Sequence, residues 1–241
     1  MVSIVVESLR ERDVELKNGD ILAISSKVVA SAEKRVVSLR EIHPSEKARE
    51  LADKYSLEPE FAELVLRESE KIYGGVNKSI LTLKNGILTV NAGVDNKNTP
   101  VGYAVLWPLD PQSRADEIRK EIKQRTGKSV GIIIADSQVV PLRLGTRGLA
   151  LAVSGFKPVE DCRGKEDLFQ KTLIITRNSI ADDLASAAHL LMGETNEQTP
   201  VVLIRDAPVT FVEAVNGEEM KIPPEECVYM SDKCLCCGRK I

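Results

Sequence analysis

Ile132-Ile133-Ile134-Ala135-Asp136-Ser137 is a run of apolar, mostly branched residues that ends in a carboxylate and a hydroxyl. A short apolar run of this kind predicts a buried strand that carries two oxygen ligands at its end. Oxygens held at the end of a rigid strand suit Mg²⁺ or Mn²⁺ and the phosphates that such ions carry. The alternative is that Asp136 only caps the turn that follows the strand.

The segments on either side of this run predict strands and helices in no regular alternation. The strongest signal is Lys84-Asn85-Gly86 between the apolar residues 80–83 and 87–90, which is typical of a β-hairpin. Further strands are expected within residues 19–25, 149–153, 173–176 and 200–204, and helices from residue 45 and at 58–72, 114–125 and 179–192. Gly74-Gly75 is expected to end the second helix. This order predicts an α+β fold of mixed sheets with helices.

The composition is that of an ordinary globular protein, with 43% hydrophobic and 29% charged residues in a chain of 241. A net charge of −3 implies no broad basic face, so we expect neither nucleic acid nor a membrane as a partner. No apolar segment is long enough to span a bilayer, and the first residues lack the pattern of a signal peptide. We therefore expect a cytoplasmic protein.

Four of the five cysteines crowd the C-terminal end of the chain, at Cys227, Cys234, Cys236 and Cys237. In a cytoplasmic protein such a cluster binds metal or is redox-active more often than it forms disulfides. Its spacing lacks two separated Cys-x-x-Cys pairs, so a loosely ordered tail is the alternative to a zinc or iron–sulfur site. We divide the chain into a main region of residues 1–215 and a Cys-rich tail of residues 216–241.

Asp95, Asp136 and Glu194 are acidic residues at the ends of predicted apolar elements. Each has a small or turn-permitting neighbour, namely Gly93, Ser137 and Gly193. Carboxylates that converge from separate elements repel one another unless cations lie between them, and two such cations can clamp phosphate oxygens. The alternative is that the three acids belong to unrelated surface turns.

Nucleophilic catalysis has little support in the sequence. The chain has only two histidines, His43 and His189, and we interpret both as structural. Cys162 lies beside a cationic residue but has no paired histidine nearby, so a nucleophilic role is a weak hypothesis. A basic set that follows the central strand faces either an anionic substrate or solvent: Arg143, Arg147, Arg163 and Lys165.

Several motifs occur in the order in which one known family carries them. They begin with Asn91-Ala-Gly-Val-Asp95-x-x-Asn98 and continue with Pro108-Leu-Asp-Pro111, Gly127-Lys128, the apolar run into Asp136-Ser137, and Arg143-x-Gly145. Ser154-Gly155, residues 161–168, Ala181-Asp182 and Leu190-Leu-Met-Gly193-Glu194 follow. On these motifs, which extend over roughly residues 19–205, the chain resembles the coenzyme F420-0:γ-glutamyl ligases.

The resemblance implies an intertwined homodimer of the F420-0:γ-glutamyl ligase-like fold. It implies a ligase that uses GTP to join L-glutamate, through its amine, to the carboxylate of coenzyme F420-0, a deazaflavin precursor. By resemblance, Asp95 and Asp136 would hold one divalent ion, Mg²⁺ or Mn²⁺, while Ser137 and Glu194 would hold a second. Arg143 is the expected catalytic residue. The residues expected to contact the nucleotide are Ser26, Lys27, Asn98, Met192, Gly193, Thr195 and Thr199.

The chain departs from the family pattern around the expected nucleotide site. The phosphate-binding lysine of the family falls at Ser31, so Lys27 or Lys34 would have to replace it. The glycine-rich stretch that follows Gly193-Glu194 in the family reads Thr195-Asn-Glu-Gln-Thr199 here. We therefore expect a divergent member. The alternatives are a ligase of the same fold that acts on another carboxylate, and a non-catalytic module that binds a metal or an anion.

Overall fold

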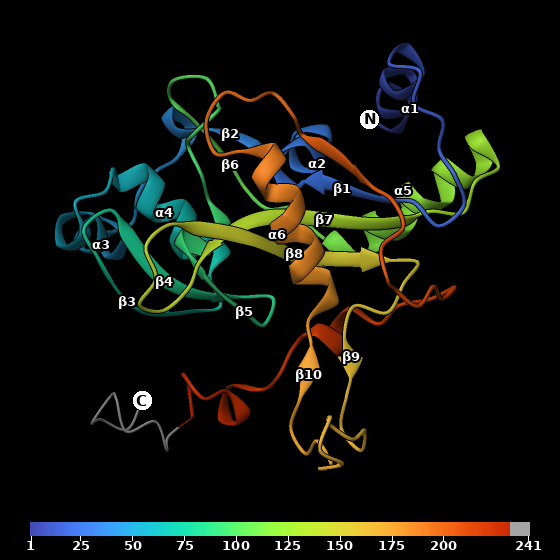
Figure 1. The fold of residues 1–241 in the computed structure, drawn as a ribbon. Coiled ribbons are helices and arrows are strands. Elements are labelled where there is room, and N and C mark those ends of the chain that lie inside the picture. The colour runs from blue at the N-terminus through green and yellow to red at the C-terminus, as the bar shows by residue number, and fades with distance from the viewer. Residues whose placement is uncertain (232–241) are drawn as a thin grey trace.

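The centre of the molecule is a four-stranded mixed sheet in the strand order β11-β1-β7-β8 (Figure 1). The structure is a computed structural model that describes residues 1–231. In this sheet β1 (Ile21–Ser25) is parallel to β7 (Gly131–Val139), while β11 (Val201–Ile204) and β8 (Thr146–Ser154) join as antiparallel neighbours. The expectation of an α+β fold with mixed sheets is confirmed.

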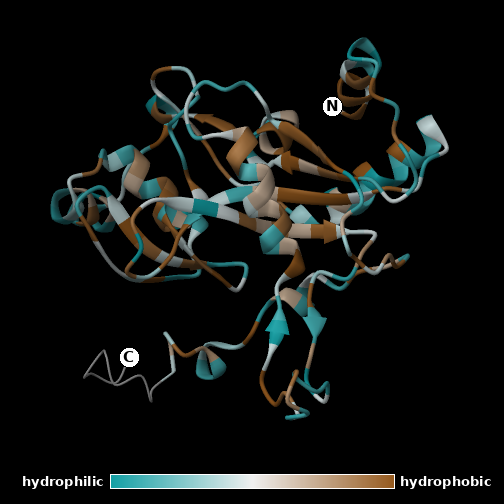
Figure 2. Cartoon of the chain, viewed as in Figure 1, coloured by the Kyte–Doolittle hydropathy of each residue, from teal (hydrophilic) through white to brown (hydrophobic). Residues whose placement is uncertain are grey.

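Alternation along the strands gives this sheet two apolar faces. Ile132 and Ile134 pack into one core cluster with α1 (Val2–Glu11), α2 (Ser26–Ala32) and α5 (Pro111–Thr126). Ile133 packs into the other cluster with the alanines of α6 (Ile180–Met192). Figure 2 shows the apolar colouring of the central strands between these layers. Each fully buried isoleucine contributes about 1.5–3 kcal/mol to folding, so this run fixes the position of β7 firmly.

A second layered unit lies beside the C-terminal half of β7, which includes Asp136. It contains the sheet β3-β4-β5 and the pair β2-β6, covered by two helices. Its elements are β2 (Val36–Ser38), η1 (Leu39–Glu41), α3 (Glu46–Tyr55), α4 (Pro59–Glu68), β3 (Lys71–Val76), β4 (Ser79–Lys84), β5 (Ile87–Val90), η2 (Asn91–Gly93) and β6 (Tyr103–Val105). The predicted hairpin is confirmed, with positive φ at both Asn85 and Gly86 of its turn.

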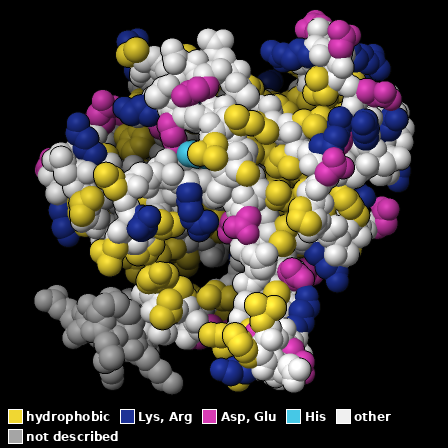
Figure 3. Space-filling view, viewed as in Figure 1, with side chains coloured by type: hydrophobic (Ala, Val, Ile, Leu, Met, Phe, Trp, Pro, Cys, Tyr) yellow, Lys and Arg dark blue, Asp and Glu magenta, His cyan; other side chains and the backbone are white. Residues whose placement is uncertain are grey.

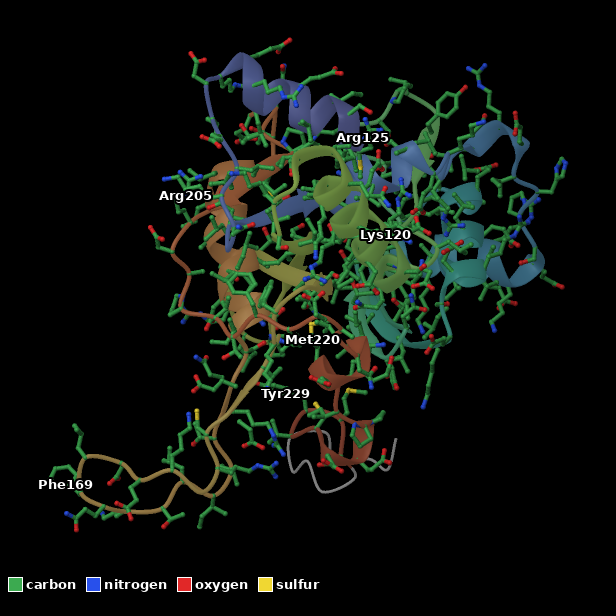
Figure 4. The ribbon with its side chains drawn as sticks, turned by 90° about the vertical axis from the view of Figure 1, so that its right-hand side faces the viewer. Lys120, Arg125, Phe169, Arg205, Met220 and Tyr229 are labelled. Carbon is green, nitrogen blue, oxygen red and sulfur yellow. The ribbon has the colours of Figure 1, made fainter. Side chains whose placement is uncertain are left out.

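A narrow arm projects from the body between β8 and α6. Its only strands are β9 (Glu160–Asp161) and β10 (Arg177–Asn178), and Figure 4 shows Phe169 at its far end. The predicted strand at residues 173–176 is wrong, because Ile174 and Ile175 lie in the arm with 79% and 83% of their surfaces exposed. Figure 3 shows apolar side chains gathered on this lower part of the molecule.

The chain after residue 215 forms two short 3₁₀ helices within the described residues, η3 (Gly217–Met220) and η4 (Pro224–Glu226). Cys227 is partly buried and not in a disulfide. Cys234, Cys236 and Cys237 lie outside the described residues, so the metal or cluster site proposed for them stays a prediction. The division of the chain at residue 215 also stays a prediction.

Several element boundaries differ from the sequence prediction, and two of them change how the prediction is interpreted. The helix expected over residues 58–72 ends at Glu68, and Gly74 and Gly75 lie inside β3 rather than behind the helix. Strand β7 continues past its apolar run to Val139, so Asp136 lies within the strand and not at its end. In residues 1–231 we find no helix with the length and apolar character to cross a membrane.

Candidate functional site

Asp136 projects from β7 toward Trp107, which follows β6, and toward the first residues of α2. Its Oδ2 accepts a hydrogen bond from the indole Nε1–H of Trp107. Burial raises the pKa of Asp136 above its ordinary value, although hydrogen bonds from Trp107, the Ser137 backbone and Ser26, together with the charge of Lys27, act in the opposite direction. No Lys or Arg in residues 1–231 forms an ion pair with this carboxylate.

The turn formed by η2 explains why Trp107 can approach Asp136. Asn91, Ala92 and Gly93 all have positive φ, and a Cβ on Gly93 would lie 2.3 Å from the Trp107 ring. The Asn91 side chain accepts from the Ile80 backbone N–H at 2.8 Å, which ties this turn to β4. The first three residues of the motif, Asn91 to Gly93, therefore form a left-handed turn that makes room for the indole.

A buried charge network lies behind the indole. The Nζ of Lys84, which is 6% exposed, lies 5.5 Å from the centre of the Trp107 ring and 2.5 Å from Glu68 Oε2. Arg35 contacts the same carboxylate at 2.9 Å and donates from Nε to the Trp107 carbonyl at 3.0 Å. Sequence analysis missed Trp107 and this network, because their roles depend on contacts between residues far apart in the chain.

Asp95 leaves the same turn and bridges to Val105 of β6 through backbone hydrogen bonds of 3.0 and 2.7 Å. Its Oδ2 lies 2.6 Å from Nζ of Lys27, the second residue of α2. Nζ of Lys27 also donates to the Lys97 carbonyl at 3.1 Å. Two residues predicted for different roles, metal and nucleotide binding, are thus directly paired.

Glu194 follows the C-terminal end of α6, where Gly193 has a φ of +68°. Its Oε1 accepts from Thr146 Oγ1 at 2.6 Å and contacts His189 Nε2 at 2.8 Å. Burial acts to raise the pKa of Glu194, but hydrogen bonds from Thr146, His189 and Ser137 outweigh it and lower the pKa. His189, which sequence analysis treated as structural, therefore contacts a predicted metal ligand.

Two adjacent hollows meet at Asp136 and Ser137. The larger, about 500 Å³, also contains Glu194 and six of the seven residues predicted to contact nucleotide: Lys27, Asn98, Met192, Gly193, Thr195 and Thr199. The smaller, about 240 Å³, is lined by Asp95 together with Asp136 and Ser137. Nδ2 of Asn98 donates to the Thr195 carbonyl at 2.8 Å, which joins residues 97 positions apart at the rim of the larger hollow.

Three of the predictions fit this arrangement less simply. Ser26 is buried and contributes to the surroundings of Asp136, but it does not line the larger hollow. Arg143 lies in the exposed loop between β7 and β8 and lines neither hollow. Within residues 1–231, no three His, Cys, Asp or Glu side chains come together as a metal-binding group. The acids instead border the hollows in pairs, Asp95 with Asp136 and Asp136 with Glu194.

The sequence matches one protein family over most of its length. Residues 1–206 match the model of the family described as F420-0:Gamma-glutamyl ligase. A protein named Coenzyme F420:L-glutamate ligase from Methanococcus maripaludis strain C7 is 42% identical over 215 residues, which cover 89% of this chain and 86% of the relative. A protein of the same name from Methanothermobacter thermautotrophicus is 34% identical over 224 residues, covering 92% and 89%.

Proposed function

Because the chain belongs to the F420-0:gamma-glutamyl ligase family, we propose that it uses GTP to join L-glutamate, through its amine, to the carboxylate of coenzyme F420-0. The expected enzyme class, a ligase that forms an amide between an acid and an amino acid, is confirmed by the family description and by the names of the relatives. The metal, the phosphate donor and the acceptor molecule are parts of the proposal.

The reaction has two steps that together consume one GTP. A carboxylate oxygen of the acceptor attacks the γ-phosphorus, the bond to GDP breaks, and an acyl phosphate forms. The glutamate ammonium releases one proton to solvent, and its nitrogen attacks the acyl carbon. The bond to phosphate then breaks, and the second proton from nitrogen leaves with the phosphate. Enzymes catalyse such transfers by positioning the groups and stabilising charge.

The observation that carries the proposal is that two hollows share the Asp136–Ser137 wall. The larger has the volume expected of a small-molecule site and contains most of the residues predicted to contact nucleotide. Its lining has one lysine, Lys27, against three carboxylates, Asp136, Glu194 and Glu197. A triphosphate carries several negative charges, so this hollow could bind it only together with cations.

The donor set fits Mg²⁺ or Mn²⁺. The side chains that face the shared wall, Asp95, Asp136, Ser137 and Glu194, offer only oxygen, which these ions prefer. Mg²⁺ commonly uses one or two carboxylates and completes its coordination with water and substrate phosphates, so pairs of acids suffice. Such ions, when bound, would neutralise charge on the phosphates during transfer.

The remaining side chains have roles that follow from their contacts. Trp107 fixes one oxygen of Asp136, and the Ser137 backbone and Ser26 also donate hydrogen bonds to this carboxylate. His189 and Thr146 hold the Glu194 carboxylate from one side. Lys27, now paired with Asp95, is the cation within reach of the hollow that could move to a phosphate, in place of the lysine absent at position 31.

We also propose that the chain forms a homodimer through its arm. Leu168, Phe169, Ile174 and Ile175 are 79–99% exposed there, and an arm this thin has no core of its own to bury them. The family resemblance favours a second copy of the chain as the partner that covers these side chains. Light scattering at micromolar concentration should give twice the chain mass, and Phe169→Asp together with Ile174→Asp should give monomer.

One incubation tests the enzymatic proposal. Purified protein with Mn²⁺, GTP, coenzyme F420-0 and L-glutamate should yield GDP, phosphate and the glutamylated product by mass spectrometry. Nucleotide hydrolysis that requires glutamate and a different carboxylate would favour a ligase of the same fold with another acceptor. Tight binding of Mn²⁺ and GTP with no product from any carboxylate would favour a non-catalytic module.

A further inference from the structure

We propose that the Lys27 ammonium substitutes for the divalent ion at Asp95 in the metal-free protein, and that metal binding releases Lys27 to the phosphates of the nucleotide. The proposal rests on the proposed ligase function and adds to it a coupling between metal and nucleotide. Lys27 is paired with Asp95 in the structure, so the ammonium and a divalent ion compete for one carboxylate.

The ion pair of Lys27 and Asp95 crosses from one hollow to the other. Lys27 lines the larger hollow and Asp95 lines the smaller, while Asp136 and Ser137 line both. The distance from Nζ of Lys27 to Oδ2 of Asp95 is 2.6 Å. Burial raises the pKa of Asp136, and the charge of Lys27 is among the influences that act in the opposite direction. The ammonium therefore acts on both acids of the pair assigned to one divalent ion.

Asp95 is held in place by contacts other than the one with Lys27. Its backbone pairs with Val105 through hydrogen bonds of 3.0 and 2.7 Å, and its Oδ1 accepts from the Lys97 backbone N–H at 2.8 Å. Within residues 1–231, Oδ2 has Lys27 as its only hydrogen-bond partner. An ion that binds Asp95 through Oδ2 must therefore displace the ammonium, while the backbone contacts remain.

Lys27 is the partner that can move. Its side chain is 27% exposed, and apart from Asp95 its ammonium donates only to the Lys97 carbonyl, at 3.1 Å. Its neighbours in α2, Ser26 and Val29, are buried, so the helix keeps its place while the flexible four-carbon stem turns. Among residues 1–231, Lys27 is also the only lysine or arginine that lines either hollow. A phosphate in the larger hollow would attract this ammonium first.

These contacts predict that metal and nucleotide strengthen each other's binding through Lys27. Without nucleotide, a divalent ion at Asp95 must break an ion pair and then lie near a like charge, and both effects weaken its binding. With nucleotide, the released ammonium pairs with a phosphate, so it no longer loses a partner. By linkage, the metal increases the affinity for nucleotide by the same factor.

Removal of the Lys27 charge should change the two affinities in opposite directions. Without nucleotide, Lys27→Met should bind Mn²⁺ about 2- to 5-fold more tightly than wild type, the range that a partly exposed ion pair provides. At saturating Mn²⁺ and without acceptor, it should bind GTP about 10- to 100-fold more weakly, because a phosphate loses a charged hydrogen-bond partner. Electron paramagnetic resonance of free Mn²⁺ measures the first affinity, and titration calorimetry measures the second.

Two further variants separate this role from a structural one. Lys27→Arg keeps the charge, so its Mn²⁺ affinity without nucleotide should stay at the wild-type value. Lys34→Met is the matched control, because Lys34 is an exposed lysine just behind the same helix that lines neither hollow and forms no ion pair in the described chain. Both affinities of Lys34→Met should equal those of wild type.

An Mn²⁺ affinity of Lys27→Met that is unchanged or lower without nucleotide would overturn the proposal, because no competing cation would have been removed. That result leaves the ligase function intact as long as wild-type protein forms the glutamylated product. If Lys27→Met does not fold, Lys27→Gln removes the same charge and takes the same test. If wild-type protein forms no glutamyl product, the proposed function fails, whatever the Mn²⁺ affinities are.

Discussion

Asp20 and Asp136 are two carboxylates near opposite ends of the parallel strands β1 and β7, and their surroundings are opposite in kind. Asp20, which is 1% exposed, accepts hydrogen bonds of 2.8 Å from both Nε and Nη2 of Arg205 and one of 2.7 Å from the Lys17 backbone. Asp136 accepts from a neutral indole and has no ion-pair partner in the described chain.

The pKa shifts follow this difference. Burial acts to raise the pKa of Asp20, but the hydrogen bonds and charge of Arg205 and the Lys17 backbone outweigh it and lower the pKa. Burial raises the pKa of Asp136, because its partners compensate less. Asp20 is thus a completed ion pair that serves stability, whereas no cationic side chain of the described chain pairs with Asp136. Incomplete compensation of this kind is common at functional sites.

Among the variants that test the contrast between Asp20 and Asp136, replacement of Asp136 should have the largest effect. Asp136→Asn keeps the shape of the side chain and removes the charge that a divalent ion needs. Mn²⁺-dependent GTP binding should weaken by more than the roughly 10- to 100-fold that loss of an outer partner costs a metal site. Titration calorimetry with and without EDTA measures it.

The same variant should leave the metal-free fold intact. The free energy of unfolding of Asp136→Asn without metal should not fall, because the buried charge is removed together with its desolvation cost. Tight Mn²⁺–GTP binding by Asp136→Asn, or a large loss of stability, would place Asp136 in the same class as Asp20.

Removal of Arg205 should give the largest loss of stability. Arg205→Leu leaves Asp20 buried without its cation, which costs about 2–4 kcal/mol once the partial exposure of Arg205, 34%, is allowed for. Urea unfolding measures the loss. The double variant Asp20→Asn with Arg205→Leu should recover part of it, since no unpaired charge remains, and GTP binding should be unaffected in both. Equal stability of Arg205→Leu and wild type would contradict a structural role for the pair.

The sequence singled out the candidate site residues but not the residues that support them. Asp95, Asp136 and Glu194 were recognisable because each lies beside a residue with a special backbone or strand position, such as Gly93 or Gly193 with positive φ. Trp107, Lys84 and Glu68 carry no such signal. They are brought together from β4, α4 and the segment after β6, and only the folded packing reveals that they lie behind Asp136.

The errors in the fold have physical causes of the same kind. Strand β7 extends through polar residues because Ser137 and Gln138 pair with β8, and pairing of this kind leaves no apolar pattern. Residues 173–176 are apolar, but no strand of the described chain pairs with them, so an apolar run alone gave a false strand. Helix α4 ends at Glu68 because Lys71 and Ile72 pair with β4.

Removal of the indole N–H that contacts Asp136 should have a smaller effect on metal binding than replacement of Asp136 itself. Trp107→Phe keeps an aromatic ring over Lys84 and removes the N–H that holds Asp136. The affinity for Mn²⁺ should fall by about 10-fold, the lower range for loss of an outer partner, with an unchanged melting temperature. Electron paramagnetic resonance of free Mn²⁺ measures the affinity. Tyr103→Phe on β6 removes a hydroxyl from a nearby aromatic residue and is the control, for which no change is expected.

The pH dependence of the free energy of unfolding should show the smallest effect, and it tests Asp20 alone. A carboxyl whose pKa is lowered in the folded state stabilises the protein above its unfolded pKa, near 3.8, and loses that contribution as pH falls through the lowered folded value. At pH 7 Asp20→Asn should therefore be less stable than wild type by about 1 kcal/mol, since the amide oxygen can still accept a hydrogen bond but the charge is gone. The difference should shrink progressively below pH 3.8. Urea unfolding curves at several pH values test this, and two stability profiles that stay parallel down to the acid limit would show that the charge of Asp20 contributes nothing.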